Sequence, residues 1–139
     1  MRVVLPRRLR ELMVSHSLSE RPLEACGLIA GSGGGGVKRV ERVYLLRNLD
    51  LSRVHFTVDQ REQLAAVRDM RAAGLAPLGN FHSHPDTPAR PSDEDIRLSF
   101  DPAASYMILS LAGPEPVLKS FRVVRESGLV EEEPIETED

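Results

Sequence analysis

The sequence has little cysteine and little concentrated charge, and it contains no long apolar run. Its one cysteine excludes an internal disulfide and suits a reducing cytosol. No segment approaches the roughly 20 consecutive apolar residues of a transmembrane helix, and the basic N-terminus lacks the apolar core of a signal peptide. The net charge is −3 without a basic run, so nucleic acid is a poor candidate for a partner. We therefore expect a cytoplasmic globular protein that binds neither a membrane nor nucleic acid.

The length of the chain bounds its domain organisation. The 139 residues, 41% of them hydrophobic, can form one domain with a substantial core. The sequence shows no internal repeat and no second domain. We expect residues 1–130 to form this domain and residues 131–139 to form an acidic, frayed C-terminal tail.

Two helices are predicted from apolar residues that recur at three- and four-residue steps. The first spans residues 6–17. The second spans residues 60–73, is capped by Asp59 and ends at Gly74. The side chains that the second helix should present to the core are Leu64, Val67 and Met70.

Six strands are predicted from apolar or alternating segments. They cover residues 24–31, 37–47, 54–58, 76–84, 106–111 and 117–125. The Gly- and Ser-rich segment 32–36 joins the first two strands as a hairpin turn, and it lacks the Gly-Lys-Ser/Thr ending of a phosphate loop. The order of elements predicts an α/β (α+β) domain with a curved mixed sheet flanked by helices.

The segment Asn80–Asp95, which reads N-F-H-S-H-P-D-T-P-A-R-P-S-D-E-D, carries most of the chemistry. Successive side chains of a strand point to opposite faces, so His82 and His84 share a face and can converge on one ion. The three prolines that follow stiffen the next loop. Ser92 then caps a helix predicted over residues 92–100, with Asp95 in its first turn.

Asp95 has two competing interpretations. The spacing Ser92-x-x-Asp95 fits a capping box, in which the serine bonds the first turn and the aspartate folds back. The same carboxylate could complete a metal site with His82 and His84. We expect that Asp95 cannot fully cap and also ligate, and the histidines together with the stiff loop favour the metal site.

Two imidazoles and one carboxylate would leave one bound Zn²⁺ per chain with a net positive charge and an open fourth position, as in catalytic zinc sites. Water at that position has a pKa of about 7 and becomes a usable nucleophile. Attack on a peptide-like carbonyl also needs a carboxylate base and an oxyanion donor. Ser92 is a plausible donor. Spacing alone does not choose the base, and our candidate is Glu24 because it opens a strand that otherwise looks buried.

A rival metal pattern is His82-x-His84-x-Asp86, which occurs in binuclear metallohydrolases of the β-lactamase type. Those enzymes need a further histidine directly after the aspartate, where Thr87 stands here, and a longer chain. A zinc deaminase would need a Cys-x-x-Cys pair, which is absent.

The remaining candidates for ligands are weaker. Cys26 lies two positions from Glu24 on the same strand face and could approach the metal, but we favour a buried, inert thiol. We interpret His16 and His55 as packed or surface residues.

These residues together resemble the JAMM (MPN+) metalloprotease motif, with Glu24 upstream of His82-x-His84, seven residues, Ser92, two residues and Asp95. The segments E-A-C-G-L-I-A-G and G-N-F-H-S-H-P also look like that family's flanking sequences, and the resemblance spans residues 3–125. It implies a JAMM architecture of the cytidine-deaminase-like type. It further implies that the histidines and Asp95 are zinc ligands, that Glu24 is the general acid/base and that Ser92 stabilises the oxyanion.

Members of this family hydrolyse peptide or isopeptide bonds, often after the C-terminal glycine of ubiquitin or a ubiquitin-like protein. The chain is more similar to the short prokaryotic members, some of which remove a C-terminal cysteine or another adduct from a sulfur-carrier protein. The resemblance therefore implies a protein substrate of this kind, and the small body suggests a homodimer. Two alternatives stay open, a non-catalytic MPN-type interaction scaffold and a zinc amidase or peptidase that acts on small peptides.

Overall fold

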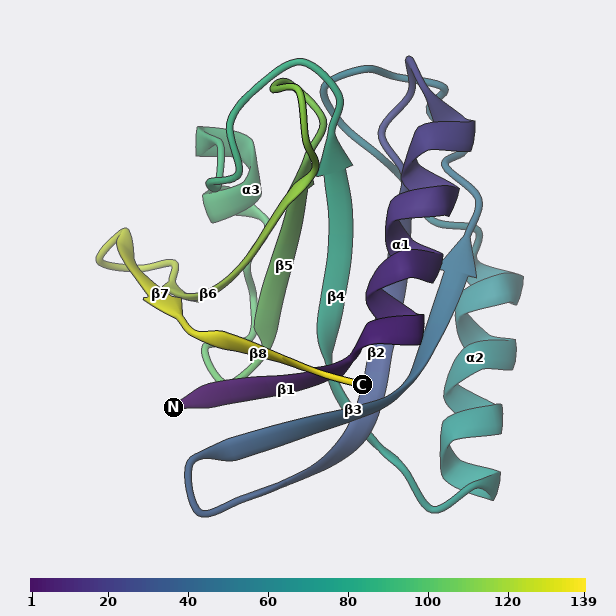
Figure 1. Cartoon of the computed structure of the whole chain (residues 1–139), viewed down its shortest axis with the longest axis vertical. Helices are drawn as coiled ribbons and strands as arrows, with labels where there is room; N and C mark the ends of the chain where they lie inside the picture. Colours follow the sequence, from purple (N-terminus) through teal and green to yellow (C-terminus); the bar gives the residue numbers. More distant parts are fainter.

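The computed structural model describes residues 1–139 and consists of one eight-stranded mixed sheet flanked by helices (Figure 1), as predicted. The strands are β1 (Arg2–Pro6), β2 (Cys26–Gly34), β3 (Val37–Leu46), β4 (Ala76–His84), β5 (Ser105–Ser110), β6 (Val117–Val124), β7 (Leu129–Glu133) and β8 (Ile135–Glu138). The helices are α1 (Arg7–Glu20), α2 (Gln60–Ala72) and α3 (Asp93–Arg97). None of the helices has the length and apolar character needed to cross a membrane.

The sheet is strongly curved. Its strand order is β7-β6-β5-β4-β2-β3-β1-β8, with parallel pairing of β4 with β5 and of β1 with both β3 and β8. The two edge strands, β7 and β8, are separated in the chain by Pro134 alone. The sheet therefore curls until its two edges meet at one end, where the Val3 amide donates to the Pro134 carbonyl at 2.9 Å.

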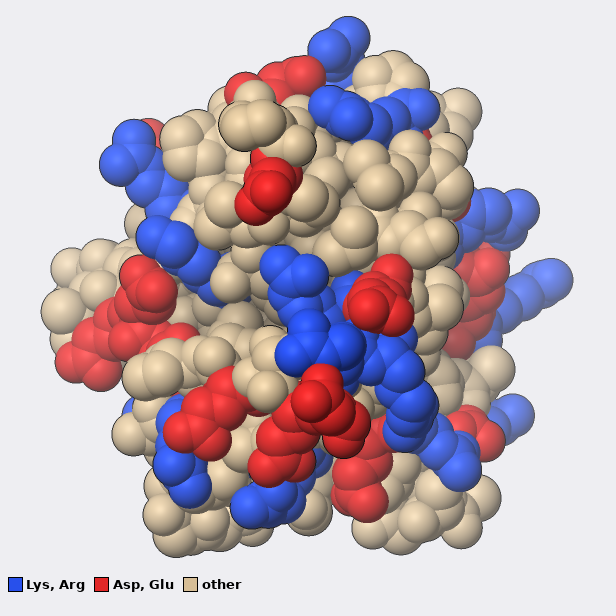
Figure 2. All heavy atoms as spheres, viewed as in Figure 1, with Lys and Arg blue, Asp and Glu red and all other residues tan.

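The expectation of a frayed tail is wrong, because residues 131–133 belong to β7 and residues 135–138 form β8. Charge composition suggested disorder, but the acidic side chains of β8 face arginines on neighbouring elements. Arg2 pairs with Glu136 at 2.9 Å, and Arg39 lies 3.9 Å from Glu138. Figure 2 shows basic and acidic groups side by side on the face in view. Such pairs contribute little individually, so the backbone ladder with β1 is the main attachment.

Helices α1 and α2 form where the apolar periodicity predicts them, although the buried face of α2 differs from the predicted one. Helix α2 has Asp59 as its N-cap and is followed by Gly74 in the left-handed conformation, as expected. Its buried residues are Ala66 and Met70, whereas Leu64 is 50% exposed. The small Ala66 side chain packs with Met70 and Ala30 of β2, which turns Leu64 toward solvent.

The strand expected over residues 54–58 does not form. Only an isolated bridge between Asn48 and Val58 is present, and residues 47–59 make an irregular loop. The short helix α3 is also shorter than the predicted range 92–100. The hairpin between β2 and β3 is confirmed, with its tight turn at Gly35 and Gly36, both at positive φ.

The core fixes the direction in which β4 presents its side chains. Phe81 is fully buried in a cluster that includes Leu9 and Met13 of α1. Because side chains alternate along a strand, the neighbouring His82 and His84 point to the opposite face of the sheet. Helix α3 lies over that face and completes the site described next.

Candidate metal centre

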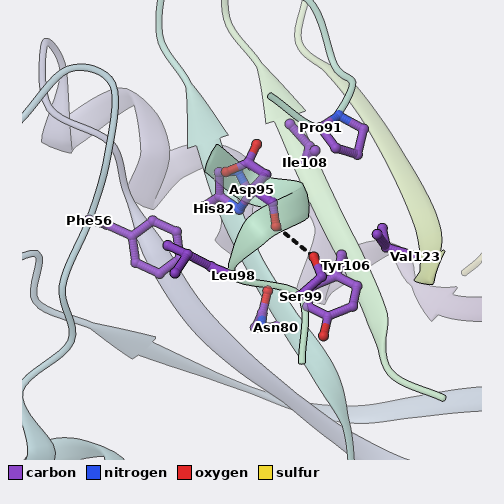
Figure 3. Close-up of a pocket in the computed structure, with 10 residues that line it drawn as sticks. All are labelled: Phe56, Asn80, His82, Pro91, Asp95, Leu98, Ser99, Tyr106, Ile108 and Val123. Carbon is purple, nitrogen blue, oxygen red and sulfur yellow. Dashed lines mark hydrogen bonds and ion pairs between the residues drawn. The ribbon is translucent and has the colours of Figure 1, made fainter. Parts of the chain in front are cut away.

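Three donor atoms from β4 and α3 form a nearly equilateral triangle. His82 Nε2 and His84 Nε2 are 3.1 Å apart, and each lies 3.2 Å from Asp95 Oδ2. Nitrogen and oxygen donors about 2.0–2.1 Å from a tetrahedral metal ion would lie about 3.3–3.4 Å from one another. The triangle therefore has the size of one face of a metal coordination tetrahedron, and Figure 3 shows Asp95 lying next to His82.

The hydrogen bonds around the triangle leave its donors free for a cation. His84 Nδ1 lies 2.9 Å from the Pro88 carbonyl, which can only accept, so Nδ1 carries a hydrogen, and Nε2 is the nitrogen that offers a lone pair to a cation when the imidazole is neutral. Burial alone would raise the pKa of Asp95, but hydrogen bonds from His82 and His84 hold that pKa far below its usual range. The carboxylate is therefore ionised beside two imidazole nitrogens, and this donor set fits a divalent metal ion.

Asp95 caps its helix and faces the histidines at the same time, so the capping geometry that we expected to compete with a metal role leaves the carboxylate directed toward the imidazoles. Its Oδ2 accepts from the Ser92 amide at 2.8 Å, and its own amide donates to Ser92 Oγ at 3.1 Å. A carboxylate oxygen has two lone pairs, so one can serve the backbone while the other points toward the imidazoles. The capping box thus orients the carboxylate toward the metal position.

Glu24 lies buried two residues before the start of β2, and its carboxyl group interacts electrostatically with His84 and Asp95 of the triangle. It is 2% exposed, and its Oε1 has no hydrogen-bond partner. The pKa of Glu24 is raised to about 8, mainly by burial, with the charge of His84 opposing the rise and the charge of Asp95 adding to it. A carboxyl group with this pKa can exchange a proton near neutral pH.

Ser83, which separates the two histidines, holds the Glu24 segment against β4. Its Oγ accepts from the Ala25 amide at 2.8 Å, and its own amide donates to the Ala25 carbonyl at 2.9 Å. This role of Ser83 could not be predicted from the sequence, although the residue stands inside the His-Ser-His motif. The residue links the Glu24 segment to the strand that carries His82 and His84.

Ser92 is exposed and caps α3, three residues before Asp95. Its Oγ accepts the Asp95 amide, which leaves the hydroxyl hydrogen free to donate elsewhere. This position is compatible with the oxyanion donor expected from the sequence.

An apolar pocket adjoins the triangle (Figure 3). It is lined by Phe56, Asn80, His82, Pro91, Asp95, Leu98, Ser99, Tyr106, Ile108 and Val123. The Phe56 ring stacks on the His82 imidazole with centroids 5.1 Å apart. Phe56 was not expected at the site, because residues 54–58 were predicted to form a strand and instead lie in a loop over the site.

The other sequence candidates lie outside the triangle. Asp86 is exposed and pairs with Arg53 at 3.0 Å, so the rival pattern does not assemble. Cys26 is buried, its thiol lies 3.7 Å from the Leu46 carbonyl, and burial raises its pKa to about 12, which agrees with an inert thiol. His16 is partly buried and His55 is exposed, and neither joins the cluster.

The chain is similar in sequence to one protein family and to named relatives. The family model described as prokaryotic homologs of the JAB domain matches residues 6–124. The chain is 38% identical over 124 residues to the CysO-cysteine peptidase of Mycobacterium tuberculosis (strain ATCC 25618 / H37Rv), covering 88% of this chain and 82% of the relative.

Solved structures share the fold. The solution structure of protein DSY2949 from Desulfitobacterium hafniense has a TM-score of 0.88 and 53% identity, covering 99% of this chain and 93% of that one. AF2198, a JAB1/MPN domain protein from Archaeoglobus fulgidus, has a TM-score of 0.61 and 22% identity, covering 98% and 99% of the two chains. The chain therefore belongs to the prokaryotic homologs of the JAB domain.

Proposed function

We propose that this protein is a zinc-dependent peptidase that hydrolyses the bond joining the C-terminus of a ubiquitin-like or sulfur-carrier protein to a cysteine or another adduct. The observation that carries the proposal is the donor triangle of His82, His84 and Asp95 with a buried carboxyl group, Glu24, beside it. The similarity to a protein named CysO-cysteine peptidase supports a carrier protein as the substrate.

The three donors of the triangle would hold one zinc ion, because imidazole and carboxylate ligands are common at catalytic zinc sites. Bound zinc would supply the positive charge that activates water and polarises a carbonyl group. The carbonyl of Pro88 fixes the His84 tautomer, and the capping box of Ser92 fixes Asp95, so the chain itself orients two of the donors.

Glu24 is the proposed proton carrier. Its carboxylate would take a proton from the attacking water and deliver it to the leaving amine. In the metal-free chain, burial raises the pKa of Glu24, and the same burial would help the carboxyl hold a proton between the two halves of this transfer, because a carboxyl group of ordinary pKa is a poor acid near pH 7. The Ser92 hydroxyl would donate to the carbonyl oxygen as negative charge develops there.

The pocket beside the triangle is the proposed place for the extended C-terminal tail of the carrier. Tyr106, Ile108 and Leu98 supply apolar walls, and the Asn80 amide supplies a polar group within the same pocket. Such a mixture of apolar walls and a few polar groups is usual for ligand sites.

The test combines metal analysis with hydrolysis of a purified carrier–cysteine adduct, with Glu24→Gln as the control variant. We expect one zinc per chain in both proteins and release of cysteine by the wild type alone. Protein purified without chelators that contains no zinc and cleaves nothing would favour a non-catalytic scaffold. Cleavage of short peptides without cleavage of the folded carrier adduct would favour a small-peptide amidase.

A further inference from the structure

The side chain of Asn48 uses its full hydrogen-bonding capacity inside the protein. Asn48 is 8% exposed and lies just beyond the end of β3. Its Nδ2 donates to the Glu24 carbonyl at 3.0 Å and to the His55 carbonyl at 3.1 Å. Its Oδ1 accepts from the Asp50 amide at 3.0 Å and from the Thr57 amide at 3.2 Å. Two donors and two acceptor sites are thus all satisfied by backbone groups.

These four bonds join two parts of the site. One partner is the main chain of Glu24, the proposed proton carrier. Two others, the His55 carbonyl and the Thr57 amide, flank Phe56, whose ring stacks on His82. A single buried amide therefore connects the proton carrier to the loop that packs on a proposed metal ligand.

Regular structure does not hold Glu24 in place. Strand β2 begins only at Cys26, so the ladder with β4 does not include Glu24. Its amide donates to the Ser52 carbonyl at 2.7 Å, and its carbonyl accepts from Asn48. Both main-chain groups of Glu24 are therefore bonded to the loop of residues 47–59, and Asn48 also organises that loop.

We infer that Asn48 is a positioning residue for the reaction, which fixes the Glu24 carboxylate relative to the donor triangle without touching substrate or metal. The inference rests on the proposed function of Glu24. Without the amide, the carbonyls of Glu24 and His55 would lose a buried donor, and the loop would shift to find others. A displacement of about 1 Å at a reacting group is enough to lower turnover by about 10².

The test uses two variants of this residue and one matched control in full-length, zinc-loaded protein. Asn48→Ala removes all four bonds, and Asn48→Asp keeps the acceptor oxygen but places a second oxygen against the two carbonyls. Thr57→Val is the control, because the Thr57 hydroxyl bonds Asp50 in the same loop without contacting Glu24. Turnover of the carrier–cysteine adduct, KM, zinc content and amide hydrogen exchange of Glu24 are measured for each.

We expect both Asn48 variants to lower kcat about tenfold or more while KM changes less than about threefold and zinc stays at one per chain. Exchange of the Glu24 amide should become faster in the same variants, and Thr57→Val should resemble the wild type. An Asn48→Asp protein that folds, binds zinc and keeps its kcat within about twofold would overturn the inference.

Hydrogen exchange of the wild type keeps the inference testable if both variants fail to fold. The Asn48 side-chain NH₂ protons should exchange slowly, and exchange as fast as that of an exposed amide would overturn the inference. This measurement needs no substrate. Failure of the wild type to cleave any adduct would instead count against the proposed function.

Discussion

Replacing Glu24 with glutamine changes the shape of the site little but removes the group that can ionise. The wild-type carboxyl is 2% exposed with one oxygen unpaired, and burial raises its pKa to about 8 from an ordinary value of 4.5. Each turnover needs this group to gain and lose a proton. We therefore expect the substitution to lower kcat by about 10²–10⁴ while zinc binding persists, because Glu24 is outside the donor triangle.

The same substitution should stabilise the metal-free protein at high pH. The pKa of Glu24 is higher in the folded state than in the unfolded state, so the folded state binds the proton more tightly. The stability that this gives the wild type is fully present below pH 4.5 and is lost as the pH rises through about 8. As the pH rises from 5 to 9, we expect the free energy of unfolding of Glu24→Gln to increase by about 2–4 kcal/mol relative to that of the wild type. The upper bound is about 5 kcal/mol, which corresponds to the full rise in the Glu24 pKa.

The assay is denaturant unfolding of chelator-treated wild type and Glu24→Gln at several pH values, with turnover of the zinc-loaded proteins measured in parallel. The difference in free energy of unfolding reports on Glu24 and its coupling to His84 and Asp95, because the more distant titratable groups are common to both proteins. Parallel pH curves would refute the buried-acid interpretation. Full turnover by the zinc-loaded variant would refute the assignment of Glu24 as proton carrier.

Three further predictions follow from the site and the sheet. Ser92→Ala should keep zinc but lower kcat by about 10²–10³, whereas Asp95→Ala should lose zinc. Metal analysis combined with kinetics separates the two roles, and loss of zinc in both variants would contradict this assignment. Chelation should abolish turnover and lower Tm by about 5–10 °C, both restored by added zinc; an unchanged Tm would argue against a tight site. A Cβ at Gly79 would lie 1.9 Å from the Ser105 carbonyl oxygen, so Gly79→Ala should cost about 3 kcal/mol or more in unfolding experiments. Gly34→Ala, where nothing lies within 4 Å, should cost less than about 0.5 kcal/mol, and equal costs would contradict the packing argument.

The site could be predicted from the sequence to the extent that local geometry determines it. The alternation of a strand places His82 and His84 on one face, and the first turn of α3 carries Asp95. Both rules act within a few residues. Glu24, which is far away in the chain, was chosen as the candidate base because it was expected to open a buried strand, whereas β2 begins at Cys26, and its convergence with the histidines was implied by the resemblance.

The pairing of strands that are far apart in the chain could not be predicted from the sequence. The acidic tail forms β7 and β8 because the curved sheet offers two free edges and nearby arginines, and no pattern within residues 131–139 indicates this. Residues 54–58, in the loop of residues 47–59, were mistaken for a strand because their apolar residues alternate, whereas Asn48 holds the loop backbone in an irregular path. The burial of Leu64 also failed as a prediction because a small neighbour, Ala66, lets α2 approach the sheet.

The most direct test of the metal site is anomalous diffraction from crystals of the zinc-loaded protein, recorded on both sides of the zinc absorption edge. One peak should lie about 2.0–2.2 Å from His82 Nε2, His84 Nε2 and Asp95 Oδ2. A zinc peak elsewhere on the protein, with these three atoms bound only to one another, would contradict the account.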